Sequence, residues 1–285
     1  MTRLMYFFVA MTVMSLSFVS CSSDDDGGGG GDPVLQNSIS AKWEIQDSNS
    51  PYASFEFNKD GNYIVVMRDA GQQQSKKLSK GLMRVRSSAP DNSGLSPVHF
   101  GTYRIEGDKI ILSGFGVMEV ISITNEEFTF SFTLQSTGET NSYVASKAEE
   151  PIASSSRTEM LCRTWNLNNI TIDVSQLSEE MINFYKAIYG ANWQTEIEKL
   201  FNKDLNGAVV LFSRAGTYLV LYDGEEGEAG LSEWKWANQQ ETTLYYSWDN
   251  WNDDWSDNIV TIKELKTNSL VIQEGELLYH LTLKK

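Results

Sequence analysis

An internal repeat constrains the fold of this chain more than any other feature of its sequence. The first copy places Trp43 ahead of the pattern Phe-x-x-x-Gly-x-Tyr at residues 57–63, and the second places Trp165 ahead of the same pattern at residues 212–218. An aromatic strand and a terminal strand led by tyrosine then follow in both copies, at 102–105 and Tyr143 and at 233–236 and Tyr279. Four matching features in one order are not expected by chance. The 285 residues therefore contain two copies of one fold, each of ordinary domain size.

The local sequence of each copy is typical of short antiparallel strands. Apolar and polar residues alternate in residues 128–134 and 277–284, which is the period of a strand with one buried face. The segments 58–61 and 213–216 both end in glycine between two apolar runs, as in the tight turn of a β-hairpin. Short strands that recur about every ten residues, with turns between them, predict an antiparallel sandwich or barrel.

These residues resemble the lipocalin-like domains found in lipoproteins of gut Gram-negative bacteria. The resemblance implies a mainly β protein with two tandem antiparallel β-barrels of meander topology. They would occupy residues 35–148 and 157–285, with an exposed linker at 149–156. Lipocalins proper have a glycine two positions before the first tryptophan, where this chain has Ala41 and Arg163. The resemblance therefore implies a fold and not a particular ligand.

The second copy contains a predicted helical insert at residues 176–202. Ser178 can cap a first helix, Gly190 can end it, and a second helix can run from Asn192. The apolar residues at helical spacing are Met181, Phe184, Tyr185 and Ile188 in the first helix and Trp193, Ile197, Leu200 and Phe201 in the second. We expect the two helices to plug or cap one end of the second barrel, because that position would bury their apolar faces.

The first 21 residues have the features of an export signal. Arg3 precedes an apolar run at residues 4–19 that is short for a membrane span, and the run ends at Cys21. This ending resembles the lipobox of bacterial lipoproteins, which implies cleavage before Cys21 and lipidation of its thiol. The alternative is a secretory signal without lipidation.

Residues 22–34 form a predicted flexible tether that contains five consecutive glycines. Its first residues, Ser22, Ser23, Asp24, Asp25 and Asp26, resemble the signal that sends lipoproteins to the outer face of the outer membrane. They also fit a simple solvated spacer. We expect an outer-membrane protein that is lipid-anchored and faces the cell exterior.

Composition excludes several classes of function. The chain has 38 acidic and 23 basic residues, a net charge of −15, which argues against nucleic-acid binding. Two cysteines and two histidines are too few for a disulfide framework or a zinc cluster. Lipidation of Cys21 leaves Cys162 without a partner, and we expect it to be buried as a small apolar residue. Phosphate-binding, serine-hydrolase and metalloprotease motifs are absent from the sequence, so we expect no catalysis.

The segment 248–257 combines indoles and carboxylates more densely than any other part of the chain. Its tryptophans are Trp248, Trp251 and Trp255, and Trp234 and Trp236 precede them. Exposed indoles there can stack on sugar rings. Alternatively, Asp249, Asp253 and Asp257 can hold Ca²⁺, although the spacing fits no EF-hand loop. The third interpretation is a polar hairpin whose tryptophans fold back onto the barrel.

The first copy carries an insert at residues 68–97 in which basic residues predominate. It can be a basic patch for an acidic glycan, phosphate or lipid headgroup, or a long solvated hairpin.

The sequence leads to one main hypothesis and two alternatives. We expect a non-catalytic surface lipoprotein that binds a glycan or a small apolar ligand through its barrels, with no cofactor except the Ca²⁺ considered above. The first alternative is a structural or accessory subunit of an outer-membrane complex. The weaker alternative is a glycoside hydrolase with two carboxylates.

Overall fold

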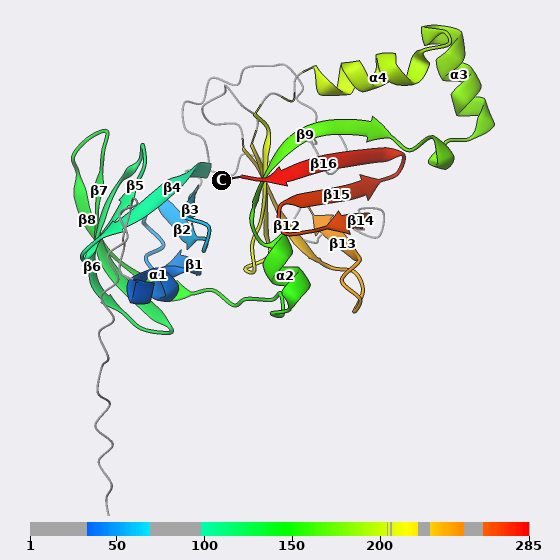
Figure 1. Cartoon of the computed structure of the whole chain (residues 1–285). Helices are drawn as coiled ribbons and strands as arrows, with labels where there is room; N and C mark the ends of the chain where they lie inside the picture. Colours follow the sequence, from blue (N-terminus) through cyan, green and yellow to red (C-terminus); the bar gives the residue numbers. More distant parts are fainter. Residues whose placement is uncertain are drawn as a thin grey trace, which may run out of the picture.

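The computed structural model describes residues 33–68, 98–203, 205, 207–221, 229–247 and 259–284. These residues form two closed antiparallel β-barrels in tandem, with a few short helices around them (Figure 1). The sequence-based prediction of two tandem barrels is therefore confirmed.

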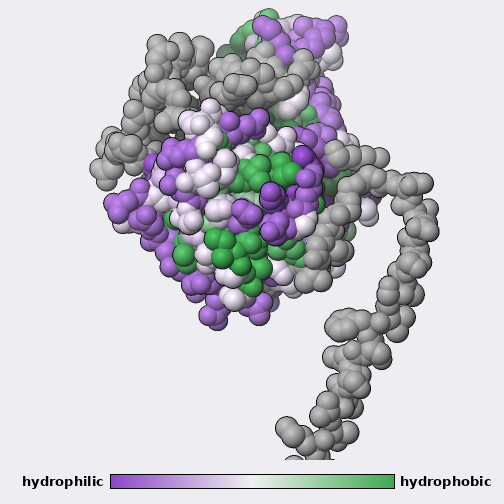
Figure 2. Space-filling view, turned by 90° about the vertical axis from the view of Figure 1, so that its left-hand side faces the viewer, coloured by the Kyte–Doolittle hydropathy of each residue, from purple (hydrophilic) through white to green (hydrophobic). Residues whose placement is uncertain are grey.

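The first barrel has eight strands that neighbour one another in chain order. They are β1 (Lys42–Ile45), β2 (Tyr52–Phe57), β3 (Asn62–Met67), β4 (Val98–Glu106), β5 (Lys109–Leu112), β6 (Gly116–Ile123), β7 (Glu127–Leu134) and β8 (Thr140–Lys147). The barrel closes where β8 pairs with β1, with Trp43 opposite Lys147. Figure 2 shows the face of this barrel turned away from the second, on which apolar residues gather among polar ones. Exposed apolar side chains of this barrel include Ile121 and Val144.

The second barrel repeats this topology. Its strands are β9 (Thr164–Ile172), β10 (Val209–Phe212), β11 (Thr217–Leu221), β12 (Ala229–Trp236), β13 (Thr243–Ser247), β14 (Ile259–Leu265), β15 (Ser269–Glu274) and β16 (Leu277–Leu283). The last strand, β16, pairs with β9 and closes the barrel. Because each strand pairs with its neighbours in the chain, turn chemistry is sufficient to guide most of the pairing.

The hairpin turns of the repeat are equivalent at the level of single hydrogen bonds. The N–H of Gly61 donates to the Asn58 carbonyl at 3.1 Å, and the N–H of Gly216 donates to the Ser213 carbonyl at 3.2 Å. The two glycines have φ angles of 84° and 81°, in the left-handed region that favours glycine. This backbone requirement explains why the glycine recurs in both copies.

The opening of each barrel is also equivalent. A short helix precedes the first strand, α1 (Pro33–Ile39) in one copy and α2 (Ser156–Leu161) in the other. The Trp43 indole donates to the carbonyl of Ile39 at 2.9 Å, and the Trp165 indole donates to that of Leu161 at 3.0 Å. Each tryptophan thus holds the end of a helix against the core of its barrel.

Aromatic side chains fill the described interior of both barrels. The first interior contains Trp43, Tyr52, Phe55, Phe57, Tyr63, Phe115, Phe128, Phe130, Phe132 and Tyr143, and the second contains Trp165, Phe212, Tyr218, Trp234, Tyr246 and Tyr279. Each of these side chains is at most 9% exposed. Side chains buried to this extent have almost no water-sized space beside them. The interiors that they form are therefore packed cores and not open ligand cavities.

The helical insert between β9 and β10 is present. It consists of a 3₁₀ turn (Val174–Gln176), α3 (Glu179–Tyr189) and α4 (Trp193–Asn202). Ser178 caps α3 by accepting from the Met181 N–H at 3.2 Å, and Gly190 ends the helix, as predicted. The pair lies outside the second barrel, with α4 beside β9 and α3 farther out (Figure 1). It does not plug the barrel, whose interior is filled by its own aromatic residues.

The apolar faces of the two helices are only partly covered. Phe184 and Ile188 of α3 are 57% and 55% exposed, and Leu200 and Phe201 of α4 are exposed as well. Trp193 and Ile197 are buried, together with Ile172 of β9. The prediction that both apolar faces would be buried is therefore wrong for α3 and for the end of α4.

Helix α4 covers an edge that strand pairing leaves open. Strand β10 pairs with residues 164–166 of β9 and leaves the far half of β9 without a neighbour on that side. The Asn202 amide accepts from the Ile170 N–H at 2.7 Å and donates to its carbonyl at 2.8 Å. Glu198 accepts from the Ile172 N–H at 3.0 Å. The helix thus satisfies backbone groups that would otherwise form an exposed sheet edge. None of the described helices is both long and apolar enough to cross a membrane.

Candidate functional site

The two barrels contact each other through equivalent faces of the repeat. Ile64 of β3 and Val98 of β4 form a small apolar cluster with Leu211 of β10 and Leu219 of β11. Ile64 and Leu219 occupy the same position in the two copies, two residues after the N-terminus of their strands. Partly buried residues at the rim of this cluster are Val66, Phe100, Leu221 and Leu231. The outer face of one barrel therefore packs on the outer face of the other.

Hydrogen bonds that are buried or partly buried also join the barrels. Asp60 accepts from both the backbone N–H and the hydroxyl of Thr164, at 2.8 and 2.7 Å. The Asn62 amide donates to the same hydroxyl at 3.0 Å. The Thr217 hydroxyl donates to the Glu56 carboxylate at 2.7 Å. Each bond links residues more than a hundred positions apart, so these bonds fix the barrels against each other.

Glu56 is the most unusual group in this interface. It lies on the outer face of β2 and is only 4% exposed. Burial raises the pKa of Glu56, while hydrogen bonds from Ser213 and Thr217 and the nearby charge of Lys42 act in the opposite direction. Desolvation is the largest of these effects, so the folded protein favours the neutral acid more than water does.

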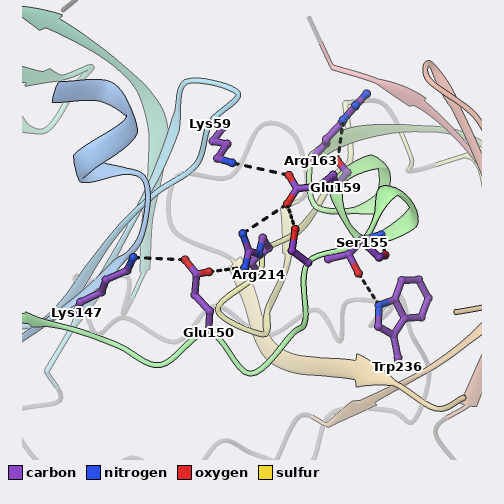
Figure 3. A network of polar contacts seen from close by, with 10 residues as sticks. Lys59, Lys147, Glu150, Ser155, Glu159, Arg163, Arg214 and Trp236 are labelled. Atoms are coloured by element: carbon purple, nitrogen blue, oxygen red, sulfur yellow. Dashed lines mark hydrogen bonds and ion pairs between the residues drawn. The ribbon is translucent and has the colours of Figure 1, made fainter. Parts of the chain in front are cut away.

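A set of ion pairs surrounds the linker between the barrels (Figure 3). Arg214 contacts Glu150 at 2.7 Å and Glu159 at 3.5 Å. Lys147 lies 3.9 Å from Glu150, and Lys59 lies 3.9 Å from Glu159. Arg214 therefore joins the linker to α2, and the two lysines of the first barrel complete the set more loosely.

A pocket of about 560 Å³ opens between the barrels at this set of ion pairs. Its basic lining residues are Lys42, Lys59, Lys147, Arg163, Arg214 and Lys284. Its acidic lining residues are Glu56, Asp60, Glu150 and Glu159. Basic residues thus outnumber acidic ones in this pocket, whereas acidic residues predominate in the chain as a whole.

The structure places the sequence-predicted site residues in different surroundings. Trp234 is 1% exposed in the second core and donates to the Ser213 carbonyl at 2.9 Å. Trp236 is partly buried and donates to the Thr158 hydroxyl at 2.9 Å. Trp234 thus offers no exposed indole face, because strand alternation directs it into the barrel. It contacts Trp236 edge to face at 5.3 Å.

Other candidates lie outside the described residues. These are Cys21, the segment Ser22 to Asp26, the basic insert after Arg68, and the whole Trp/Asp segment with Trp248, Asp249, Trp251, Asp253, Trp255 and Asp257. In the part of the chain that the structure describes, no three His, Cys, Asp or Glu side chains are grouped as metal ligands.

Cys162 lies at the edge of the pocket and packs against the second core. Burial raises the pKa of its thiol, and the neighbouring Glu159 raises it further. A thiol with a raised pKa stays protonated near neutral pH and is a poor nucleophile.

The pocket residues were not identified as a site from the sequence. They come from the ends of the first strands, two turns, the linker, α2 and the C-terminal end of the chain. One signal was nevertheless available. The second residue of the repeated turn is basic in both copies, Lys59 in the first and Arg214 in the second. A basic residue kept at one position of a repeat in an acidic chain could have drawn attention to these turns.

The sequence matches no protein-family model, and a search of curated proteins gives no match either.

Proposed function

We propose that this chain is a non-catalytic, lipid-anchored surface protein that binds a small glycan in the pocket between its two barrels. The observation that carries this proposal is the contrast between filled barrel interiors and an open pocket of about 560 Å³ outside them. That volume falls within the range of ligand sites, about 300–1,000 Å³. A polar lining with many hydrogen-bonding groups suits a hydroxyl-rich ligand.

The same contrast disfavours the small apolar ligand that we considered from the sequence. Such a ligand would need an open barrel, as in lipocalins that hold one small molecule. The described aromatic side chains occupy that volume in both barrels. The lipocalin resemblance is thus used here for the fold only.

Absence of catalysis is supported by the state of the pocket carboxylates. Asp60 and Glu56 accept hydrogen bonds from threonines of the other barrel, and Glu150 and Glu159 pair with Arg214. A glycosidase needs one carboxyl group free to donate a proton and another free to act as nucleophile or base.

Binding is tested with the mature chain, which begins at lipidated Cys21, or with a soluble form that begins at residue 22, both of which contain the two barrels. Isothermal titration against a panel of neutral and acidic oligosaccharides measures affinity, and product analysis of the same samples detects cleavage. We expect at least one oligosaccharide to bind and none to be cleaved. If no oligosaccharide of the panel bound, the proposal would be refuted. Cleavage of an oligosaccharide would favour the alternative that the protein is a glycoside hydrolase.

Anchoring is tested separately. We expect radiolabelled palmitate to label the wild-type chain in cells and not the Cys21→Ser variant. We also expect protease added to intact cells to degrade the anchored protein. Protection from protease would place it on an inner face, and unlabelled wild-type protein would refute lipidation.

A second candidate function is an accessory subunit of an outer-membrane complex. The exposed apolar face of α3, with Phe184 and Ile188, favours this second function, because soluble proteins rarely leave such an apolar face exposed to water. A photo-crosslinking residue at position 184 would then capture an outer-membrane protein. The control position is Ile121, an equally exposed apolar residue of the first barrel. Equal labelling at both positions would argue against a specific partner.

A further inference from the structure

Building on the proposed function, we infer that the ligand of the pocket between the barrels is an acidic glycan fragment that carries carboxylate or sulfate groups. The inference rests on which charges of the pocket are already neutralised by the protein and which are left to meet a ligand.

The acidic side chains of the pocket form hydrogen bonds or ion pairs with other residues of the protein, or are buried. Asp60 accepts hydrogen bonds from the backbone N–H and the hydroxyl of Thr164, and Glu150 forms an ion pair with Arg214 at 2.7 Å. Glu159 shares Arg214 and accepts a hydrogen bond from Ser154. Glu56 is buried at the wall, where desolvation opposes its ionisation. Arg214 therefore offsets part of the charge of Glu150 and Glu159, and burial disfavours the charged form of Glu56. The donors to Asp60 are neutral groups and do not offset a carboxylate charge. The six basic residues of the pocket still outnumber its four acidic ones.

Several basic side chains of the pocket have only long ion-pair contacts or none with the described residues. The charge of Lys42 acts on the nearby Glu56, but neither Lys42 nor Lys284 forms an ion pair with a described carboxylate. The Lys284 amine lies 5.5 Å from the centroid of the Phe100 ring. Lys59 and Lys147 reach their nearest carboxylates only at 3.9 Å. Such long contacts at a partly exposed site contribute little stability, so these amines can turn to a better acceptor.

The basic groups come from both barrels. Lys42, Lys59 and Lys147 belong to the first, and Arg163, Arg214 and Lys284 belong to the second. A ligand with two or more anionic groups can therefore contact both barrels at once. A fragment of two sugar units with acidic substituents matches this requirement better than a single small ion.

Hydrogen-bond donors without a partner in the pocket wall also support an oxygen-rich ligand. The side-chain nitrogen of Asn58 and the Nε atom of Arg214 are buried and have no hydrogen-bond partner. Both residues line the pocket. Buried donors without acceptors are rare and costly in folded proteins. A small side-chain shift towards an oxygen-rich ligand would supply the missing acceptors.

The test compares three disaccharide probes by isothermal titration with the mature chain in 50 mM NaCl. The probes are a digalacturonate, a sulfated heparin disaccharide and neutral cellobiose. We expect at least one acidic probe to bind about tenfold more tightly than cellobiose. We also expect its affinity to fall when NaCl is raised to 200 mM, because salt screens exposed charges. The preferred acidic probe distinguishes carboxylate from sulfate recognition.

Variants locate the binding. Lys42→Gln and Lys284→Gln should each weaken binding of the acidic probe about fivefold, and both variants should still fold because both side chains are partly exposed. The control is Lys109→Gln, an exposed lysine of β5 outside the pocket, which should bind like the wild type.

Each outcome decides a separate question. Tighter binding of cellobiose than of either acidic probe would overturn the inference and leave the proposed function standing. Acidic binding that Lys42→Gln and Lys284→Gln leave unchanged would also overturn the inference, because the site would lie elsewhere. A lack of binding by all three probes, followed by failure of the wider oligosaccharide panel, would overturn both.

Discussion

The Thr217 hydroxyl of the second barrel donates a 2.7 Å hydrogen bond to the Glu56 carboxylate of the first. In the repeat, the position of Glu56 corresponds to Leu211, which packs in the apolar cluster between the barrels. The two copies thus differ where their faces meet, and one copy supplies an acid where the other supplies a hydrocarbon. This difference makes the interface sensitive to protonation.

Replacement of Glu56 by glutamine should change how stability depends on pH. Burial raises the pKa of Glu56 above the ordinary value of 4.5, so the folded chain keeps a proton that the unfolded chain releases. The contribution of Glu56 to the free energy of unfolding therefore falls as pH rises from about 4.5 through the raised pKa. Glu56→Gln lacks this loss and should be more stable than the wild type at pH 8.

Urea denaturation of both proteins between pH 5.5 and pH 8 measures this effect. The free energy of unfolding of Glu56→Gln should increasingly exceed that of the wild type as pH rises. Glu44→Gln, an exposed glutamate of β1, is the control and should show no such trend. A constant difference between Glu56→Gln and wild type would contradict a raised pKa.

A charge at the apolar cluster should separate the barrels. Ile64 is fully buried against the second barrel, so Ile64→Glu places a carboxylate where desolvation costs several kcal/mol. Separation of the barrels would return that carboxylate to water and leave each barrel core intact. We expect a larger radius of gyration by small-angle X-ray scattering and an unchanged far-ultraviolet circular dichroism spectrum. Ile121→Glu, at a residue 61% exposed, should change neither. A compact Ile64→Glu protein would show that the cluster does not hold the barrels together.

Loss of either repeated indole should destabilise its own barrel by a similar amount. Trp43→Phe and Trp165→Phe each remove a donor to a buried helix carbonyl and leave a gap in a packed core. We expect each to lower the free energy of unfolding by about 1–3 kcal/mol. Thermal and urea unfolding followed by circular dichroism measure the change. If either variant matched the wild type within about 0.5 kcal/mol, the indole contact would not stabilise the barrel.

The exposed face of α3 should tolerate polar substitution. Phe184→Ser with Ile188→Ser removes side chains that are already more than half exposed, so stability should change by less than about 1 kcal/mol. Ile197→Ala of α4, at a buried position beside Trp193, should cost about 2–4 kcal/mol. Calorimetry of the two proteins gives the comparison. A large loss for the α3 double variant would mean that this face is covered in the folded protein.

Sequence patterns predicted the features that depend on near neighbours along the chain. Alternation at residues 128–134 predicted β7, and glycine in the repeated turns predicted the hairpins at Gly61 and Gly216. The cap at Ser178 and the stop at Gly190 predicted the limits of α3. These features follow from backbone geometry within a few residues, which a single sequence expresses directly.

Other expectations failed because they concerned which surface would cover a residue. The apolar spacing of α3 correctly indicated a helix and wrongly indicated its burial, since the second barrel had no space for it. Trp234 belonged to a set of possible sugar-stacking residues, yet its alternation within β12 directs it to the core.

The sequence by itself determined that the chain contains two copies of a fold built from short antiparallel strands, because strand period and turn residues are local properties and the repeat can be read directly. The barrel form was implied by the resemblance to lipocalin-like domains, and closure is seen only where β8 meets β1 and β16 meets β9. The tertiary structure alone decided that Glu56 would be buried, that Asp60 would meet Thr164, and that basic side chains of both barrels would gather around one pocket. An outward residue of a strand has the same local pattern whether it faces water or a second barrel. Only contacts between residues more than a hundred positions apart distinguish these two cases.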